Sequence, residues 1–124
     1  MAAPNIVAVT SINGKSVVSR PANTALYSIL TNPAGSNRVY KINNIICSNQ
    51  NGASSVSANV FYNDQGAGLG NNTSLVFLAS VPALTTLIVI DKSTSFYLEE
   101  DRSIVVSSGT ANGISFSVSY EDIG

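Results

Sequence analysis

The chain has 124 residues, a length that fits one domain whose core is large enough to fold without disulfides or metal ions. Its charged fraction is only 10% and its net charge is -1, so we expect no binding to the phosphate backbone of nucleic acids. The sequence holds no histidine and one cysteine, which excludes an internal disulfide and the Ser-His and Cys-His forms of nucleophilic catalysis.

Serine, threonine and asparagine replace charged residues as the polar component of the chain. Hydroxyl and amide groups keep a surface wet without the high desolvation cost of charges, and a low charge leaves little repulsion between copies. This composition suits a protein that works in a permanent assembly. It suits equally an ordinary β domain rich in serine and threonine.

Two short apolar segments open the chain, with a turn signal between them. Residues 6–9 and 17–18 are aliphatic, and Asn13-Gly14 is the kind of pair that tight hairpin turns favour. This pattern predicts a first hairpin. We expect residues 1–5, which precede it, to form a flexible N-terminal arm, and we expect no signal peptide.

A break and two further strands follow. Residues 20–23 contain a proline, which cannot donate to a strand ladder, and residues 24–31 then predict a strand. Residues 32–37 combine proline, glycine and asparagine and predict a loop. Residues 38–48 predict a long strand whose dominant apolar face changes near Asn43-Asn44, which indicates a β-bulge or a bend.

The middle of the chain predicts a second hairpin and a glycine-rich loop. Residues 48–54 predict a turn that joins the preceding strand to a partner at residues 55–62. Residues 63–72 carry the glycines, but a phosphate-binding loop needs a helix after them and another strand follows here. The sequence therefore indicates a flexible or partner-ordered loop, beside which Phe61 and Tyr62 are the candidate aromatic platform for a sugar.

Two strands with apolar residues on both faces come next, at residues 73–81 and 86–90. The outer face of such a strand needs cover from a second copy, another partner or an internal loop. The alternative is a central strand beneath a long loop. We expect interface contacts in this region and in the preceding loop, at Leu69, Leu75, Phe77, Val81, Leu87 and Val89.

The last third of the chain predicts four consecutive strands. Apolar residues in 87–90, 96–98 and 104–106 are separated by polar turns. Residues 114–120 then alternate at period two, with apolar side chains on one face and serines on the other. This alternation predicts a sheet with one dry face and one wet face.

The pattern as a whole predicts a single all-β domain over residues 1–124. About eight or nine short strands without helical periodicity are typical of a two-sheet antiparallel sandwich. The strand number and the long loops between hairpins favour a jelly roll. An immunoglobulin-like sandwich is the alternative, although the chain lacks the tryptophan and the cysteine pair that mark that fold.

Residue patterns for catalysis and metal binding are sparse. The acidic cluster Glu99-Glu100-Asp101 lies in a strand and turn, where consecutive side chains point to alternating sides and do not converge on one bond. It therefore predicts a solvated turn, and its spacing is not that of an EF-hand. We predict no enzymatic activity, no cofactor and no bound metal. Cys47 lies in an apolar run and is expected to be a buried, inert thiol.

Several segments resemble small virion structural proteins of tailed bacteriophages, especially phages of marine cyanobacteria. The resemblance lies in VPALTTLIVIDK (81–92), FYLEEDRSI (96–104) and VSYEDI (118–123), and it extends to the order and spacing of the segment that begins with RVYKI (38–42). It does not extend strongly to the first predicted hairpin or to the glycine-rich loop.

This resemblance implies a non-enzymatic virion component assembled in the host cytoplasm. It implies most directly a capsid decoration or cement protein, and alternatively a tail, neck or fibre component with a carbohydrate-binding or receptor-binding β module. The expected partners are copies of the chain itself, with a trimer as one candidate state, and the major capsid protein or other virion proteins. Nucleic acid and membranes are not expected partners. The matched segments hold scaffold positions, so no site residues are implied.

Overall fold

A computed structural model describes residues 8–124, which form short β-strands and one 3-10 helix. The arm predicted at residues 1–5 and the start of the first predicted strand lie outside this range. None of the helical structure within it is long and apolar enough to cross a membrane. The elements are β1 (Ile12–Ser19), β2 (Tyr27–Asn32), β3 (Val39–Asn49), β4 (Val56–Asn63), β5 (Asn72–Val81), β6 (Thr86–Ile90), η1 (Lys92–Thr94), β7 (Phe96–Leu98), β8 (Arg102–Ser108) and β9 (Ile114–Ile123).

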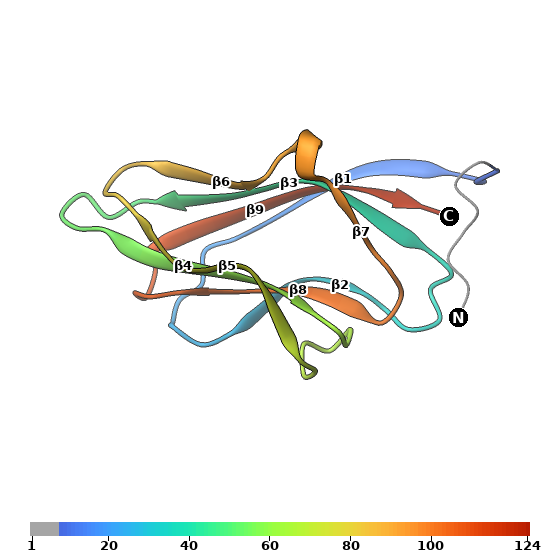
Figure 1. Cartoon of the computed structure of the whole chain (residues 1–124), viewed down its shortest axis with the longest axis horizontal. Coiled ribbons are helices and arrows are strands. Elements are labelled where there is room, and N and C mark those ends of the chain that lie inside the picture. The colour runs from blue at the N-terminus through green and yellow to red at the C-terminus, as the bar shows by residue number, and fades with distance from the viewer. Residues whose placement is uncertain (1–7) are drawn as a thin grey trace.

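The strands form two antiparallel sheets that face each other. Sheet A has the order β1-β9-β3-β6, with β7 also paired to β3, and sheet B has the order β2-β8-β4-β5. In Figure 1 sheet A forms the upper layer and sheet B the lower one. The predicted all-β, two-sheet antiparallel sandwich is confirmed.

The strand order is that of a jelly roll. The chain crosses between the sheets at most of its connections, and β6 and β7 act as one strand that η1 interrupts, because both pair with β3. Each sheet then holds four strand positions, as in two interleaved Greek keys. In an immunoglobulin-like sandwich the first two strands lie side by side in one sheet. Here β1 and β2 lie in different sheets, which excludes that alternative.

The hairpin predicted around Asn13-Gly14 is wrong. Strand β1 runs straight through this pair, and Gly14 lies opposite Glu121 in β9. Neither Asn13 nor Gly14 takes the positive φ that such a turn needs. The reason is tertiary: the alternating strand β9, from the far end of the chain, offers β1 a full antiparallel partner, and this pairing outweighs the local turn preference.

The hairpin predicted between residues 38–48 and 55–62 is also wrong, because β3 belongs to sheet A and β4 to sheet B. Buried Asn49 fixes the crossing between the sheets. Its side-chain amide donates to the backbone oxygens of Ser54 (3.1 Å) and Val81 (2.8 Å), and its side-chain oxygen accepts from the Asn51 N–H (2.8 Å). The side chain thus satisfies backbone groups that the change of sheet would leave unpaired.

The bulge predicted near Asn43-Asn44 is confirmed. The register of β3 against β9 shifts between Ile42 and Asn44. The extra residue lets Ile42 and Ile45 both point into the core, and both are fully buried.

The core lies between the two sheets. Cys47 is buried in it and forms no disulfide, and burial raises the pKa of its thiol to about 12, as expected for an inert thiol. The fully buried large side chains of this core include Ile42, Ile45, Val60, Leu98, Ile104, Val106, Ile114, Phe116 and Val118.

Candidate interaction surfaces

Strands β5 and β6 form one side of the sandwich. Each is an edge strand, β5 in sheet B and β6 in sheet A, and residues 82–85 link them directly. The alternative of a central strand beneath a long loop is therefore excluded for both. Apolar side chains on an edge strand of a small sandwich are open to partners.

The six residues expected at an interface divide into three groups by exposure. Leu69 and Phe77 are exposed, at 83% and 62%. Leu75, Leu87 and Val89 are half-buried against the core, and Val81 is buried within it. Val81 pairs with Val56 and points between the sheets, so its side chain has no free surface to offer a partner.

Three further apolar residues of this region are exposed: Leu78 and Ile88, which lie within the two segments where contacts were expected, and Leu84, which lies in the link between them. The exposure of Ile88 follows from alternation, because its neighbours Leu87 and Val89 pack against the core. The exposure of Leu78 has no such signal in the sequence, since it results from a bulge.

Leu78 adopts a left-handed backbone conformation, with φ 50°, in the middle of β5. The register of β4 against β5 shifts on both sides of Val60. Asn59 holds the bulge: its side-chain oxygen accepts from the Leu78 N–H (2.7 Å), while its amide donates to the Ser107 hydroxyl (3.0 Å). A positive φ is strained for a bulky residue and persists only where the surroundings enforce it.

The bulge places two neighbouring large apolar residues in solvent. Phe77 is 62% exposed and Leu78 60% exposed, whereas adjacent residues of a regular strand point to opposite faces. The Phe77 ring also lies beside that of Phe61, with 6.2 Å between ring centroids. We call Phe77 and Leu78 the bulge patch.

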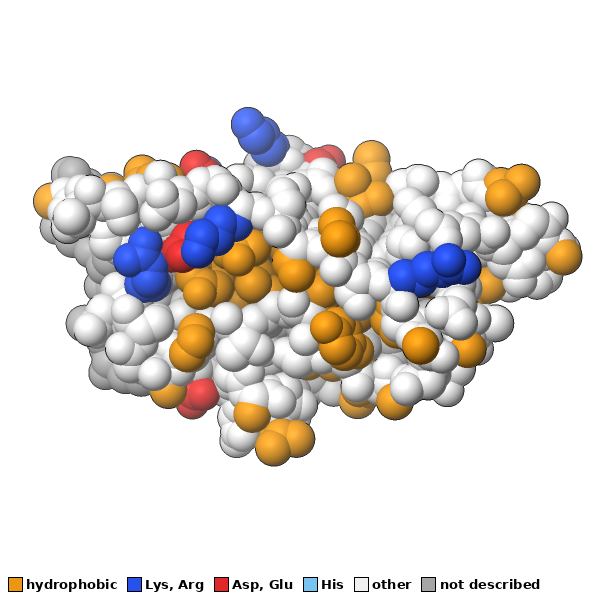
Figure 2. Space-filling view, turned by 180° about the vertical axis from the view of Figure 1, so that it is seen from behind, with side chains coloured by type: hydrophobic (Ala, Val, Ile, Leu, Met, Phe, Trp, Pro, Cys, Tyr) orange, Lys and Arg blue, Asp and Glu red, His pale blue; other side chains and the backbone are white. Residues whose placement is uncertain are grey.

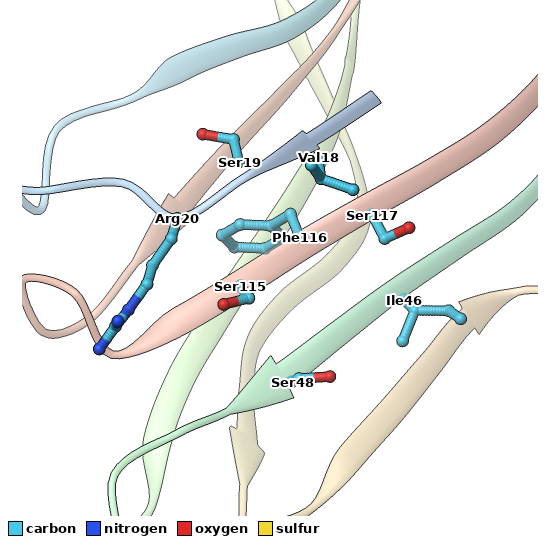
Figure 3. A pocket seen from close by; sticks show the side chains of 8 residues that line it. All are labelled: Val18, Ser19, Arg20, Ile46, Ser48, Ser115, Phe116 and Ser117. Atoms are coloured by element: carbon cyan, nitrogen blue, oxygen red, sulfur yellow. The ribbon is translucent and has the colours of Figure 1, made fainter. Parts of the chain in front are cut away.

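The outer face of sheet A carries a second apolar and hydroxyl-rich surface. Val18, Ser117, Ile46 and Ile88 lie in one register row across β1, β9, β3 and β6. A shallow hollow of about 320 Å³ includes Val18, Ser117 and Ile46 of this row in its lining (Figure 3). It is lined by Val18, Ser19, Arg20, Ile46, Ser48, Ser115, Phe116 and Ser117.

The residues that line this hollow are suited to contact with another protein surface. Its one charged lining residue, Arg20, donates through Nε to the backbone oxygen of Asn112 (2.9 Å), and the polar lining is otherwise serine. Seen from behind in Figure 2, the molecule shows a few separate charged groups on a largely uncharged surface, with hydrophobic side chains gathered between them. This hollow provides no general acid or base.

The glycine-rich loop between β4 and β5 is held by the chain's own contacts. Asn63 is fully buried, and its side chain bonds to the backbone of Gln65 and Gly70 and to the side chain of Asn72. The Ser103 hydroxyl donates to the Gln65 backbone oxygen (2.7 Å). These contacts give the loop a defined conformation without a partner chain and so count against a flexible or partner-ordered loop.

The predicted aromatic platform is not available to a sugar. Phe61 is buried, and Tyr62 is half-buried with its ring 6.0 Å from that of Phe96. A stacking platform for a sugar needs an open ring face. Packing against neighbouring side chains covers these two rings instead.

The acidic cluster is not the solvated turn that was expected. Glu100 is only 4% exposed, and within residues 8–124 neither of its carboxylate oxygens has a hydrogen-bond partner. Asp101 accepts a hydrogen bond from the Gly66 N–H (3.0 Å) and so ties the turn to the glycine-rich loop. In the part of the chain that the structure describes, no group of three or more His, Cys, Asp or Glu side chains is placed to hold a metal ion.

A charged triad joins strands β1, β3 and β9. Lys15 Nζ lies 2.9 Å from Asp122 Oδ2, and Arg38 Nε donates to Asp122 Oδ1 from the residue before β3. Burial of Asp122 would raise its pKa, but the hydrogen bonds and charges of Arg38 and Lys15 outweigh this effect and lower the pKa. The hydrogen bond to Asp122 likewise raises the pKa of Lys15.

The triad predicts a stability that is lost in acid. Because the pKa of Asp122 is lower in the folded state than in the unfolded state, its contribution is complete above the unfolded pKa, near 3.8, and fades as the pH falls through the folded value. We expect Asp122→Asn to lower the free energy of unfolding by about 1–3 kcal/mol at neutral pH and to flatten the pH dependence below about pH 4. Thermal unfolding by circular dichroism between about pH 2 and 7 measures both effects.

Glu99→Gln is the matched control for the triad, because Glu99 is an exposed carboxylate that forms no ion pair among residues 8–124. It should leave the acid limb of the stability curve as in the wild type. An acid limb that is identical in wild type and Asp122→Asn would contradict the role given to the triad.

Comparison with known proteins found no family model that matches this sequence and no match among curated proteins. The function must therefore be inferred from the fold and from the chemistry of the exposed surfaces.

Proposed function

We propose that this chain is a non-enzymatic structural protein of a tailed-phage virion, a capsid decoration or cement protein that stabilises the shell through apolar and hydroxyl-rich contacts. The observation that carries the proposal is the bulge patch, where a strained backbone exposes Phe77 and Leu78 side by side on an edge strand. Strain that persists in a native fold is a reason to look for a function at that position.

The mechanism is adhesion. Covering a large apolar side chain that was exposed contributes about 1.5–3 kcal/mol, so a patch of two such residues supports a modest contact. A shell presents many symmetric copies of each contact, and several modest contacts of one subunit act together as an avid attachment. The low net charge means that little repulsion opposes close packing of neighbours.

The fold is compatible with this role, because jelly rolls occur in viral capsid proteins as well as in lectins. The fold alone does not distinguish a capsid role from a lectin role, so the choice between them depends on the chemistry of the exposed surface. The alternative of a tail, neck or fibre component with a sugar-binding module needs an exposed aromatic platform, and Phe61 and Tyr62 do not supply one.

Localisation on particles tests the proposal. An antibody raised against the folded chain should label the heads of virions produced by the phage that encodes it, as seen by immunogold electron microscopy. Labelling confined to tails would overturn the decoration role and leave the virion role standing. Absence of the chain from complete, purified particles would overturn both.

The bulge patch provides a sharper prediction. The double variant Phe77→Ser, Leu78→Gly should weaken binding of the chain to heads stripped of it by roughly 30- to 400-fold, because each side chain has about 60% of its surface left to cover and the pair removes about 2–3.5 kcal/mol of apolar burial. Its stability should stay within about 1 kcal/mol of the wild type, since glycine relieves the left-handed strain at position 78. Co-sedimentation with heads measures the binding, and thermal unfolding measures the stability.

Tyr27→Ser is the matched control for the bulge patch. Tyr27 is also a large exposed side chain of sheet B, but it lies on the opposite edge strand, β2. It should bind heads like the wild type. Equal loss of binding in the control, or wild-type binding by the double variant, would show that the bulge patch is not the contact.

A further inference from the structure

Strand β1 presents a free backbone edge. It pairs with β9 on one side, and among residues 8–124 no strand pairs with it on the other. Ser11 and Gly124 exchange two backbone hydrogen bonds, of 2.8 and 3.0 Å, just before the β1–β9 register begins. Antiparallel pairs alternate between bonded and non-bonded, so Ile12, Gly14, Ser16 and Val18 direct their N–H and C=O groups away from β9.

The other sheet edges carry features that obstruct pairing. The register of β2 shifts between Ser28 and Leu30, and β5 contains the bulge at Leu78. Strand β6 has five residues and is followed by the η1 turn. Bulges and short strands are the devices by which proteins block edge-to-edge association. Strand β1 instead keeps one unbroken register over its eight residues and contains no proline.

The side chains of this edge also favour a partner. Val18 is 73% exposed and Ile12 55% exposed, and both project on the solvent side of sheet A. Lys15, the one charged residue of β1, leans back across β9 to Asp122 and so does not project past the edge. The edge therefore offers unpaired backbone groups and apolar side chains with its charge neutralised.

From this we infer that β1 pairs antiparallel with β1 of a second copy, which joins two A sheets into one continuous sheet across a two-fold axis. A strand edge recognises an extended segment, and an antiparallel edge is complementary to itself under two-fold symmetry. The register centred on Lys15 pairs Ile12 with Val18 and Gly14 with Ser16 of the second copy. In this register the outward N–H and C=O groups of all four residues find partners among the same four residues of the second copy. It also places each Ile12 side chain beside a Val18 side chain.

This inference rests on the proposed function, because it specifies one of the contacts between copies that the proposed function requires. It can be tested separately, on the purified chain in the absence of heads. The dimer should appear in sedimentation velocity between about 1 μM and a few hundred μM. Ser16→Pro removes an outward N–H but no bond to β9, so it should raise the dimer dissociation constant by roughly 10- to 100-fold without unfolding the chain. Ser16→Ala keeps the N–H and should dimerise like the wild type.

Two further measurements fix the contact. In the monomer the amides of Ser16 and Val18 should exchange rapidly with solvent while that of Val17, bonded to β9, is protected, and all three should be protected at high concentration. Under mild oxidation Lys15→Cys should form a disulfide dimer, because the two positions face each other across the axis. Ser80→Cys, exposed on β5, should not form one, and buried Cys47 should not react in either variant.

A wild-type chain that stays monomeric over this range would overturn the inference, as would a dimer that Ser16→Pro leaves unchanged. If removal of residues 1–7 abolishes the dimer and Ser16→Pro does not, the N-terminal segment is the contact and β1 is not. A wild-type chain that stays monomeric and still binds heads would refute this inference alone. A dimer that shows no binding to heads would refute the proposed function alone.

Discussion

Replacing Asn63 by alanine is expected to lower the free energy of unfolding by about 2–4 kcal/mol. The side chain is fully buried and makes four hydrogen bonds. Its oxygen accepts from the N–H groups of Gln65 (3.0 Å) and Gly70 (3.1 Å), and its amide donates to the oxygens of Gly70 (3.1 Å) and Asn72 (2.7 Å). Alanine would leave these groups without partners in a site that water reaches poorly.

The loss should extend beyond the loop itself. Gly68 lies against Ser28 and Val105, and both Val105 and Phe61 are buried although they belong to the face of sheet B that points away from the inter-sheet core. Gly68 of the loop covers Val105, and the Phe77 ring lies beside Phe61. Asn63→Ala should therefore increase hydrogen exchange in residues 64–71 and also in the middle of β8, where Val105 lies.

Urea unfolding gives the free energy, and exchange monitored by mass spectrometry gives the location of the loosening. Asn71→Ala is the matched control: Asn71 is an exposed asparagine of the same loop, with a single long side-chain contact of 3.5 Å to Asp64. It should change the stability by less than about 0.5 kcal/mol. Equal effects of the two substitutions would show that the loop does not depend on Asn63.

The fold could be predicted where the sequence pattern and the tertiary environment agree. Residues 114–120 alternate in the sequence, and β9 lies at the centre of sheet A with its apolar side chains in the core, as that alternation requires. The reversal of face at Asn43-Asn44 likewise indicated a bulge, because two inward isoleucines three residues apart cannot both fit a regular strand. Such signals are local and need no knowledge of the partner strand.

The pairing of strands could not be predicted in the same way. Asn13-Gly14 and Asn51-Gly52 each carry turn chemistry, yet the first lies inside a strand and the second marks a crossing between sheets. A jelly roll pairs strands that are distant in the chain, such as β1 with β9, so local turn preference contributes little to its topology.

The surface was the hardest part to predict. Val81 was expected at an interface and is buried, because a pattern that is apolar on both faces does not say which face meets the core. Leu78 is exposed because Asn59, nineteen positions earlier, holds its N–H in a bulge. Glu100 lies in a run of acidic residues that is typical of a solvated turn and is nevertheless buried. Each outcome depends on contacts between residues that the sequence pattern does not connect.

Phe116→Ala is expected to have the largest effect of any single substitution considered, a loss of about 3–5 kcal/mol of stability. Phe116 is 1% exposed near the start of β9, between Ser19 of β1 and Cys47 of β3, and its ring packs between the two sheets. Removing the ring forfeits its burial and leaves a cavity that the surrounding strands, tied on both sides of β9, can close only in part. A domain of this size is stable by about 5–15 kcal/mol in total, so the variant should unfold at a markedly lower urea concentration.

Phe77→Ala supplies the control for this substitution, since it deletes the same atoms from a ring that is 62% exposed on the bulge patch. It should cost less than about 1 kcal/mol, because most of that ring is already in contact with water. Urea unfolding should therefore show a loss of stability only for Phe116→Ala. Co-sedimentation should show weaker binding to heads for Phe77→Ala, which keeps its stability. A loss of several kcal/mol in Phe77→Ala would mean that this ring belongs to the core of the monomer, and the bulge patch could then not be an adhesive surface.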